Sequence, residues 1–259
     1  MPLPRLLLWV ISVSALIWCG LSWPAPPHAL ELALGFVGLF LYATLGVLWP
    51  HSGMYGNALA RGRVGTRKVA LTFDDGPHPV TTRAVLELLR AHGAHATFFL
   101  LGHKVEAHPE VVREIHAAGH TLGIHGFQHE RLFSLRSSGH AQAQIERARR
   151  SIEQACGAAP TLFRPPIGFA SHWTFLGAER AGVEIVAWSV RSLDGVRGAR
   201  PERVAQRVIE HLEDGAIVLM HDAAEHDDFT PASLAALPQI LRALKERGLS
   251  SVGVDQLPR

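Results

Sequence analysis

Cysteine is scarce in this sequence of 259 residues, with one thiol at Cys19 and the other at Cys156. The first lies in an apolar N-terminal part and the second in the charged remainder, so the folded part has no disulfide framework and needs an ordinary hydrophobic core. Excess charge is also missing, because 25 basic and 23 acidic residues leave a net charge of +2. The composition therefore gives no electrostatic reason to expect nucleic acid as a partner, and it excludes a disordered or collagen-like chain.

Charge is nearly absent from the first sixty residues, where Arg5 and Glu31 are the only Lys, Arg, Asp or Glu side chains. Two apolar segments, 6–23 and 29–49, lie there on either side of a Pro-rich break. At about 1.5 Å per residue, the first barely and the second comfortably crosses a hydrocarbon core of about 30 Å as a helix. We therefore expect residues 1–60 to form a membrane anchor, a transmembrane helical hairpin. The rival interpretation is a cleaved signal peptide, although no small-x-small cleavage signal precedes the Pro-rich break.

Basic residues predict which way the hairpin faces. The loop between the apolar segments has no Lys or Arg, whereas Arg5 precedes the first segment and Arg61, Arg63, Arg67 and Lys68 closely follow the second. By the positive-inside rule, both ends of the hairpin are then cytoplasmic. We expect a protein of a bacterial-type inner membrane, with the charged domain on the cytoplasmic face and membrane lipid as one partner.

From residue 61 onward, short apolar runs alternate with amphipathic stretches. The runs that predict strands are 69–73, 96–101, 121–125, 161–164, 184–190, 216–221 and 250–254. The helices expected between them are 81–92, 109–118, 141–155, 201–213 and 234–247. This alternation predicts parallel strands, and the nearly continuous apolar runs predict strands covered on both faces. Both an α/β barrel and a doubly wound sheet satisfy these conditions.

Two motifs at predicted strand ends contain side chains that bind metals. TFDDGP at 72–77 places two adjacent carboxylates after a strand, and HGFQH at 125–129 spaces two imidazoles four residues apart, as chelation from one side of a helical turn requires. Asp75 with His125 and His129 would make a site of two histidines and one carboxylate with open positions. Catalytic zinc and non-haem iron(II) both use such a set, so redox iron chemistry is one alternative.

Three further motifs also fall at predicted strand ends. They are RPPIG at 164–168, WSVRSLDG at 188–195 and LMHD at 219–222. The prolines of the first motif fix the backbone, while Arg164 projects a bidentate cation suited to a carboxylate. The C-terminal ends of parallel strands are where α/β barrels assemble their sites. The common position of all five motifs therefore indicates one active site and favours the barrel.

The ordered set TFDDGP, HGFQH, RPPIG, WSVRSLDG and LMH resembles the polysaccharide deacetylase family, which is also described as the NodB homology domain or carbohydrate esterase family four. The resemblance covers residues 66–254, which we expect to form one NodB-like domain. It implies an α/β fold, a distorted (β/α) barrel with about seven parallel strands. It also implies a divalent metal ion and hydrolysis of the N-acetyl amide of an amino sugar.

The resemblance further implies which side chains hold the metal. These are Asp75, His125 and His129, with one divalent ion, Zn²⁺, expected and Co²⁺, Ni²⁺ or Mn²⁺ as substitutes. Amide hydrolysis needs a nucleophilic water and a place for the developing oxyanion charge. A bound metal serves both needs, because it lowers the pKa of water and polarises the carbonyl.

By the same resemblance, Asp74 is the general base and His221 is the general acid. Arg164 is expected to pair with Asp74, and Asp194 is expected to orient His221. A carboxylate beside His221 favours the imidazolium form, from which a proton is donated to the departing amine. Oxygen activation does not require this acid–base set, so redox iron chemistry is disfavoured.

Two residues are expected to contact the substrate. A backbone N–H near Ile167 can help to hold the oxyanion, and Leu219 is implied to line the small acyl pocket. The sequence departs from the family pattern at Ile167, where Tyr is usual, at Gly195, where Trp is usual, and at Arg191, where an acidic residue is frequent. The groove is therefore expected to lose an aromatic wall and to gain a cation. Such a cation would suit a phosphate-bearing or otherwise anionic glycan, although a solvated Arg191 is the simpler alternative.

The sequence thus predicts a membrane-anchored, metal-dependent hydrolase. It would remove the N-acetyl group from an amino sugar in a polysaccharide, an oligosaccharide or a lipid-linked glycan precursor. One alternative is deformylation of a lipid-linked amino sugar, which uses the same site chemistry. Another is a catalytically inactive, membrane-anchored glycan-binding protein, against which the complete set of metal ligands, base and acid argues. The expected partners are an N-acylated amino-sugar glycan and membrane lipid, and no nucleic acid or protein partner is inferred.

Overall fold

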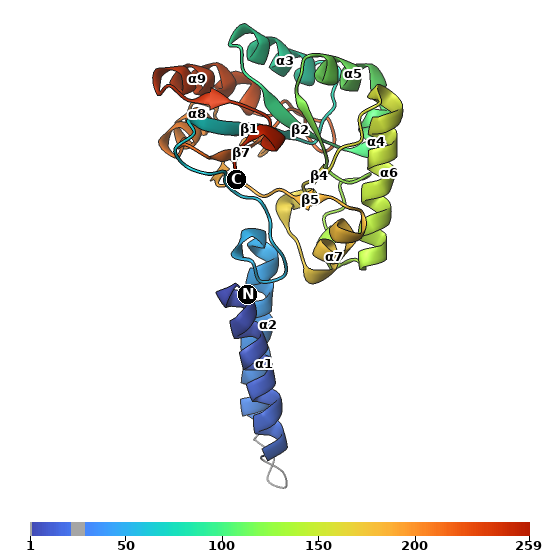
Figure 1. The fold of residues 1–259 in the computed structure, drawn as a ribbon, viewed down its shortest axis with the longest axis vertical. Coiled ribbons are helices and arrows are strands. Elements are labelled where there is room, and N and C mark those ends of the chain that lie inside the picture. Colours follow the sequence, from blue (N-terminus) through green and yellow to red (C-terminus); the bar gives the residue numbers. More distant parts are fainter. Residues whose placement is uncertain (1, 22–28) are drawn as a thin grey trace.

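The computed structural model describes residues 2–21 and 29–259, in which an α/β domain follows two N-terminal helices (Figure 1). The helices are α1 (Leu3–Leu21), α2 (Ala29–Leu48), α3 (Thr81–Ala91), α4 (Gly102–Ala107), α5 (Pro109–Ala117), α6 (Ser138–Cys156), α7 (His172–Arg180), α8 (Pro201–Glu210) and α9 (Ser233–Glu246). The strands are β1 (Lys68–Asp74), β2 (Ala96–Leu100), β3 (Thr121–Ile124), β4 (Leu162–Phe163), β5 (Glu184–Ile185), β6 (Val190–Arg191), β7 (Ile217–His221) and β8 (Ser250–Ser251).

The strands form one parallel sheet with β1 near its centre. The order along the sheet is β5-β4-β3-β2-β1-β7-β6, and β8 pairs with β1. In the register of the central strands, Phe73 of β1 lies opposite Phe98 of β2 and Met220 of β7. Within the described residues, no ladder joins β5 to β6, so the sheet curls into a barrel that stays open at that point. The prediction of a distorted, parallel α/β barrel with about seven strands is confirmed.

Residues 186–189 connect β5 to β6 across the opening of the barrel, where the two strands are not paired with each other. Leu59, in the segment that follows α2, pairs with Val186, and its carbonyl accepts a hydrogen bond of 2.8 Å from Ala187 N–H. The prediction of one strand over 184–190 is therefore wrong, because β5 and β6 lie at opposite edges of the sheet. The chain leaves the β5 edge of the sheet at Val186 and joins the β6 edge at Val190. At Val186, Leu59 makes the bridge that a neighbouring strand would otherwise make.

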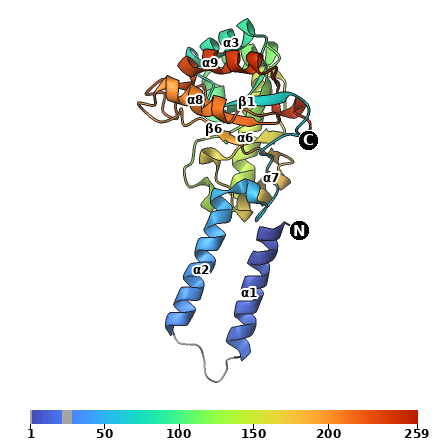
Figure 2. The same cartoon turned by 90° about the vertical axis from the view of Figure 1, so that its left-hand side faces the viewer.

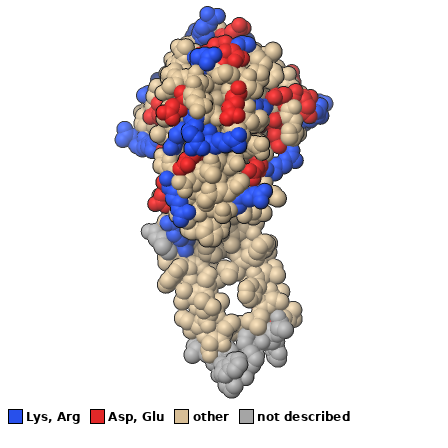
Figure 3. Space-filling model, turned by 90° about the vertical axis from the view of Figure 1, so that its right-hand side faces the viewer, with Lys and Arg blue, Asp and Glu red and all other residues tan. Residues whose placement is uncertain are grey.

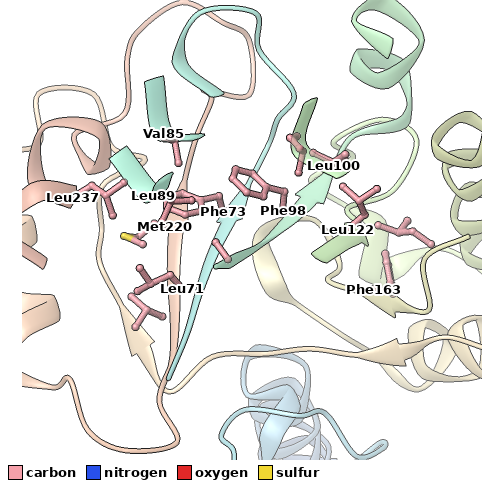
Figure 4. Close-up of a cluster of buried hydrophobic side chains, with 14 of the residues drawn as sticks. Leu71, Phe73, Val85, Leu89, Phe98, Leu100, Leu122, Phe163, Met220 and Leu237 are labelled. Atoms are coloured by element: carbon pink, nitrogen blue, oxygen red, sulfur yellow. The ribbon is translucent and has the colours of Figure 1, made fainter. Parts of the chain in front are cut away.

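Burial on both faces explains why the central strands are continuous apolar runs. In β1 and β2, every residue from Val69 to Phe73 and from Ala96 to Leu100 is buried. Phe73 and Phe98 stack with their ring centroids 5.3 Å apart, in the middle of the side-chain cluster in Figure 4. Fully burying one such side chain contributes roughly 1.5–3 kcal/mol. The core therefore fixes the strand whose end carries the first motif.

Two helices of the domain, α4 and α7, are absent from the elements expected from the sequence. The short α4 has too few turns to show a helical period. The start of α7 is a capping box in which Ser171 Oγ accepts from Thr174 N–H, while Thr174 Oγ1 accepts from Ser171 N–H. Threonine stands there in the position where Glu or Gln gives the usual signature, so this helix start is hard to recognise in the sequence.

The two N-terminal helices, α1 and α2, lie side by side below the domain and run in opposite directions (Figures 1 and 2). Tyr42 OH donates to the Pro4 carbonyl at 3.0 Å and links them. By length and composition both could cross a membrane, and 0% and 6% of their apolar windows are buried within the protein. A signal sequence passes the same test. The Pro-rich break at 24–28 and the last two residues of the segment 6–23 lie outside the described residues.

Candidate active site

The expected site residues meet around one open cavity of about 330 Å³ at the C-terminal ends of the strands. The predicted residues that line it are Asp74, Asp75, His125, His129, Ile167, Leu219 and His221. The other two, Arg164 and Asp194, are fully buried beneath the lining. The parallel register explains part of this convergence, since Asp74 at the end of β1 lies opposite His221 at the end of β7.

Three side chains form a compact metal-binding set. Nε2 of His125 and Nε2 of His129 lie 3.5 and 3.6 Å from Asp75 Oδ1, and the three ligand atoms lie within 4.8 Å of one another. Among the described residues, Asp75 Oδ1 is a buried atom without a hydrogen-bond partner. A buried carboxylate oxygen that is left unpaired is costly unless a cation neutralises it. This donor set therefore fits a divalent metal ion.

Groups behind the ligands orient the two imidazoles. His125 Nδ1 donates to the Arg164 carbonyl at 2.7 Å, which leaves the lone pair on Nε2. Burial lowers the pKa of His125, and this favours the neutral form that binds metals. His129 Nδ1 lies 3.3 Å from Glu225 Oε1, although without hydrogen-bond geometry. Both rings thus present Nε2 towards Asp75.

Arg164 lies beneath Asp74 and has partners on several sides. One terminal nitrogen donates to Asp74 Oδ1 at 2.8 Å and to Thr72 Oγ1 at 2.7 Å. The other two nitrogens donate to the carbonyls of Val186 and Ala187, at 3.3 and 3.0 Å. Burial lowers the pKa of Arg164, and the neighbouring Asp74 carboxylate opposes that shift. The guanidinium therefore fixes one oxygen of Asp74 and leaves the other available to act as a base.

His221 and Asp194 form a second charged pair. Asp194 Oδ1 lies 2.9 Å from His221 Nδ1, and Asp194 also accepts a hydrogen bond from the Ser192 hydroxyl. Burial alone would lower the pKa of His221, but the carboxylates of Asp194, Asp75 and Asp74, with Asp194 first, outweigh it and raise this pKa to about 10. Burial alone would raise the pKa of Asp194, but His221 and Ser192 hold it below its usual value. The arrangement yields an imidazolium that can donate a proton from Nε2.

Ile167 adopts a strained backbone conformation on the cavity wall. Its φ of 52° lies in the left-handed region, which is unfavourable for a β-branched side chain. Its N–H has no hydrogen-bond partner among the described residues. The adjacent Gly168 has a φ of 75°, and the Trp188 ring packs so closely that a Cβ on this glycine would lie 2.1 Å from it. The prolines before Ile167 and the packing of Trp188 on Gly168 therefore hold the Ile167 N–H, a donor without a partner, in the cavity wall.

The departures from the family pattern also lie at the cavity. Gly195 and Arg191 both line it. A Cβ on Gly195 would lie 2.9 Å from His221 Nδ1, so the imidazole occupies the space beside this glycine. Trp188 contributes an aromatic ring to the wall, and the Arg191 guanidinium lies 6.0 Å from the centroid of that ring. The cavity therefore has both an aromatic surface and the expected cation.

Two carboxylates beside the site are missing from the residues expected from the sequence. Glu225 lines the cavity next to the metal-binding set. Asp222 is buried, accepts a hydrogen bond from the Thr82 hydroxyl, and packs so closely on Gly76 that a Cβ there would lie 2.3 Å away. Burial raises the pKa of Asp222 to about 7. Both residues follow His221 in the loop after a strand, and that position is the signal that could have revealed them.

Known proteins with similar sequences and structures identify the family. The sequence model of the family described as polysaccharide deacetylase matches residues 61–186. A peptidoglycan-N-acetylglucosamine deacetylase of Bacillus cereus is 36% identical over 193 residues, which cover 74% of this chain and 88% of that protein. A family 4 acetyl xylan esterase of Clostridium thermocellum, solved with a cobalt ion, is 29% identical with a TM-score of 0.68 and covers 73% of this chain and 89% of its own.

A pseudoenzyme of carbohydrate esterase family four from Bacillus anthracis also shares the fold. It is 28% identical with a TM-score of 0.69, and the match covers 76% of this chain and 67% of that chain. The fold alone therefore does not distinguish an active member from an inactive one. The length and identity of the matches, together with the common barrel, show that this chain belongs to the polysaccharide deacetylase family.

Proposed function

We propose that the protein is a metal-dependent hydrolase that removes the N-acetyl group from an amino sugar of a glycan. The observation that carries this proposal is the joining of three functional sets in one cavity. A metal-binding set of Asp75, His125 and His129 lies beside a carboxylate fixed by Arg164 and an imidazolium fixed by Asp194. The deacetylase and esterase names of the relatives support the same reaction class.

The residues suggest how the reaction proceeds. A divalent ion such as Zn²⁺, held by the metal-binding set, would supply a Lewis acid that polarises the acetyl carbonyl and acidifies water. Asp74 would accept the proton of the attacking water through the oxygen that Arg164 leaves free. The free N–H of Ile167 is available to the oxyanion, and His221 would donate the proton that the leaving amine needs. The products are acetate and the free amino sugar.

An inactive glycan-binding protein is the alternative of a different class, and the Bacillus anthracis neighbour shows that the fold admits one. A binding protein has no need for an unpaired metal ligand, a fixed base and a fixed acid in the same cavity. Deformylation of a lipid-linked amino sugar is the enzymatic alternative. Mass spectrometry of envelope glycans and lipid-linked sugars, with and without the protein, separates these functions. A mass difference of one acetyl group supports our proposal, one formyl group supports deformylation, and no difference supports a binding role.

We further propose that residues 1–60 anchor the protein in the membrane and that residues 66–254 act on its cytoplasmic face. The exposed apolar surface of α1 and α2 supports the anchor, and the four basic residues after α2 support the orientation. Reporter fusions at residue 60 and at Arg259 test it. A signal from a cytoplasmic reporter at both points is expected. Strong alkaline phosphatase activity at both points would place the domain outside and contradict the orientation.

A further inference from the structure

One stretch of the domain, residues 165–178, contains no Lys, Arg, Asp or Glu. It follows β4 and includes most of α7. Ile167 and Trp173 in this stretch are exposed, with 37% and 51% of their surface accessible. Ile167 is exposed to the catalytic cavity, whereas Trp173 is exposed outside it. Trp is enriched at membrane–water interfaces, and a stretch without charges suits the same position.

The same stretch lies against the end of the apolar hairpin. Ala170 N–H donates to the Val47 carbonyl at 3.1 Å, and Val47 belongs to the apolar window Leu30–Leu48 of α2. A Cβ on Gly56, just after the hairpin, would lie 2.1 Å from the Phe175 ring of α7. Figures 1 and 2 both place α7 at the end of the domain nearest the hairpin. In Figure 3, an uncharged area on the lower part of the domain continues onto the hairpin.

This stretch is also a wall of the catalytic cavity, because Ile167 and Gly168 line it. Ala170 lies three positions after Ile167, and an extended chain of that length spans at most about 11 Å. The cavity wall therefore lies close to the end of the apolar window of α2.

The cavity carries a cation suited to a lipid-borne substrate. Arg191 lines the cavity and forms no ion pair within the part of the chain that the structure describes. A guanidinium recognises phosphate by charge and by its fork of donors, and in one class of membrane-borne sugars, those on polyprenyl carriers, phosphate joins the sugar to the lipid.

We propose that the stretch 165–178 rests in the headgroup region of the membrane and that the active site takes amino sugars held there on a phosphate-linked lipid. The substrate part of this inference rests on the proposed deacetylase function, whereas the membrane contact does not. Trp173 provides an interfacial anchor, and Arg191 binds the phosphate that joins the sugar to the lipid. The wall that carries the Ile167 N–H then faces a sugar that remains attached to the membrane.

Spin labels test the membrane contact without any assay of activity. The full-length protein carries Cys19→Ser and Cys156→Ser and is reconstituted in lipid nanodiscs. A nitroxide is attached to the new cysteine of Trp173→Cys in one sample and of Val80→Cys in a second. Val80 is the matched control because it is also an exposed apolar residue and lies at the start of α3, at the far end of the domain (Figure 1). The label at 173 should be more accessible to oxygen than to a water-soluble nickel complex, whereas the label at 80 should favour the nickel complex. Equal accessibility profiles at the two positions would overturn the proposal.

A second experiment compares two substrates of the protein in nanodiscs. One is N-acetylglucosamine on a polyprenyl phosphate in the same nanodiscs, and the other is a chitooligosaccharide in solution. Trp173→Glu should lower kcat/KM for the lipid-linked substrate by roughly tenfold and leave the soluble one unchanged, because a charge at the interface lifts the wall from the lipid. Arg191→Gln should lower kcat/KM more for the lipid-linked substrate than for the soluble one, and Val80→Glu should change neither value. An unchanged ratio of the two values in both Trp173→Glu and Arg191→Gln would contradict the proposal. A wild-type protein that releases acetate from neither substrate would contradict the proposed function instead, and the spin labels would still decide the membrane contact.

Discussion

Asp194 contacts His221 through both of its carboxylate oxygens. Oδ1 lies 2.9 Å from the imidazole Nδ1, and Oδ2 accepts the backbone N–H of the same residue at 2.7 Å. The carboxylate therefore fixes both the position of the strand end and the orientation of the ring that it carries. Because it is fully buried, its charge acts on His221 with little screening by solvent.

The first prediction concerns the pH dependence of activity. The Asp194 carboxylate, with smaller contributions from Asp75 and Asp74, raises the pKa of His221, so the proton needed by the leaving amine stays on the imidazole above neutral pH. Asp194→Asn removes the charge, and the alkaline limb of the kcat profile should move towards lower pH. Profiles of wild type and variant, both loaded with zinc, measure the shift. An alkaline limb at the same pH in both proteins would show that Asp194 does not set this pKa.

The second prediction separates the two adjacent carboxylates. Asp74→Asn should lower kcat by about 10²–10⁴-fold and leave metal content near one ion per chain, because it removes a base without removing a ligand. Asp75→Asn should lose both metal and activity, since the unpaired Oδ1 of Asp75 faces both imidazoles. Elemental analysis and turnover of the two variants provide a matched comparison. If Asp74→Asn emptied the site while Asp75→Asn kept its metal, the roles of these neighbours would be reversed.

The third prediction concerns the stability that the buried pair below the cavity confers. Arg164 and Asp74 are almost fully buried and lie 2.8 Å apart, so Arg164→Met leaves an uncompensated carboxylate in the interior. This should reduce the free energy of unfolding by about 3–5 kcal/mol. Denaturant titration of the single variant and of the double variant with Asp74→Asn measures the coupling. The double variant should recover part of the loss, and additive losses would show that the two side chains act independently.

The fourth prediction concerns the space beside the proposed acid. A Cβ at position 195 would lie 2.9 Å from His221 Nδ1, so Gly195→Ala should displace the imidazole from Asp194. Turnover should fall while metal content is unchanged, because His221 is not a ligand. A Gly195→Trp variant should show the same loss of turnover on every substrate, whatever the length of the glycan. Wild-type kcat in Gly195→Ala would mean that the loop moves aside and that the glycine is not required for space.

The fifth prediction concerns acid stability at the opposite ends of the strands. His120 is buried, and its Nδ1 accepts the Ala96 N–H at 3.3 Å. Burial lowers its pKa from 6.5 to about 4, so stability is complete above pH 6.5 and declines as the pH falls towards 4. The loss should reach up to about 3 kcal/mol. In His120→Asn this decline should disappear from unfolding curves measured between pH 7 and pH 4, and a parallel decline in both proteins would assign it to other groups.

Much of the site was predictable because parallel strands bring their C-terminal ends together whatever the sequence distance between them. Asp75, His125 and His129 needed only that rule, their ligand chemistry and the family pattern. The same rule points to Asp222, which directly follows β7, whereas Glu225 lies farther along an irregular loop whose path depends on tertiary contacts. The strained φ of Ile167 leaves no pattern of its own in the sequence.

The strands of the fold were predictable where they are long and buried on both faces, and less predictable where they are only two residues long. The strands β1, β2 and β7 are buried on both faces, and the prediction of strands there is confirmed. The continuous apolar pattern of the run 184–190 predicts one strand, but the run crosses between two sheet edges. Apolar periodicity reports burial and does not report which neighbour a strand pairs with.

The central claim is that this cavity hydrolyses the N-acetyl amide of an amino sugar with the help of a divalent metal. The most direct measurement is mass spectrometry of an N-acetylglucosamine oligosaccharide and of the lipid-linked sugar after incubation with the purified full-length protein. The zinc-loaded wild type should give products lighter by one acetyl group, with an equal amount of released acetate, and both should vanish in the metal-stripped protein and in Asp74→Asn. Unchanged masses of both substrates with a fully zinc-loaded wild type, or equal deacetylation by wild type and Asp74→Asn, would contradict the account.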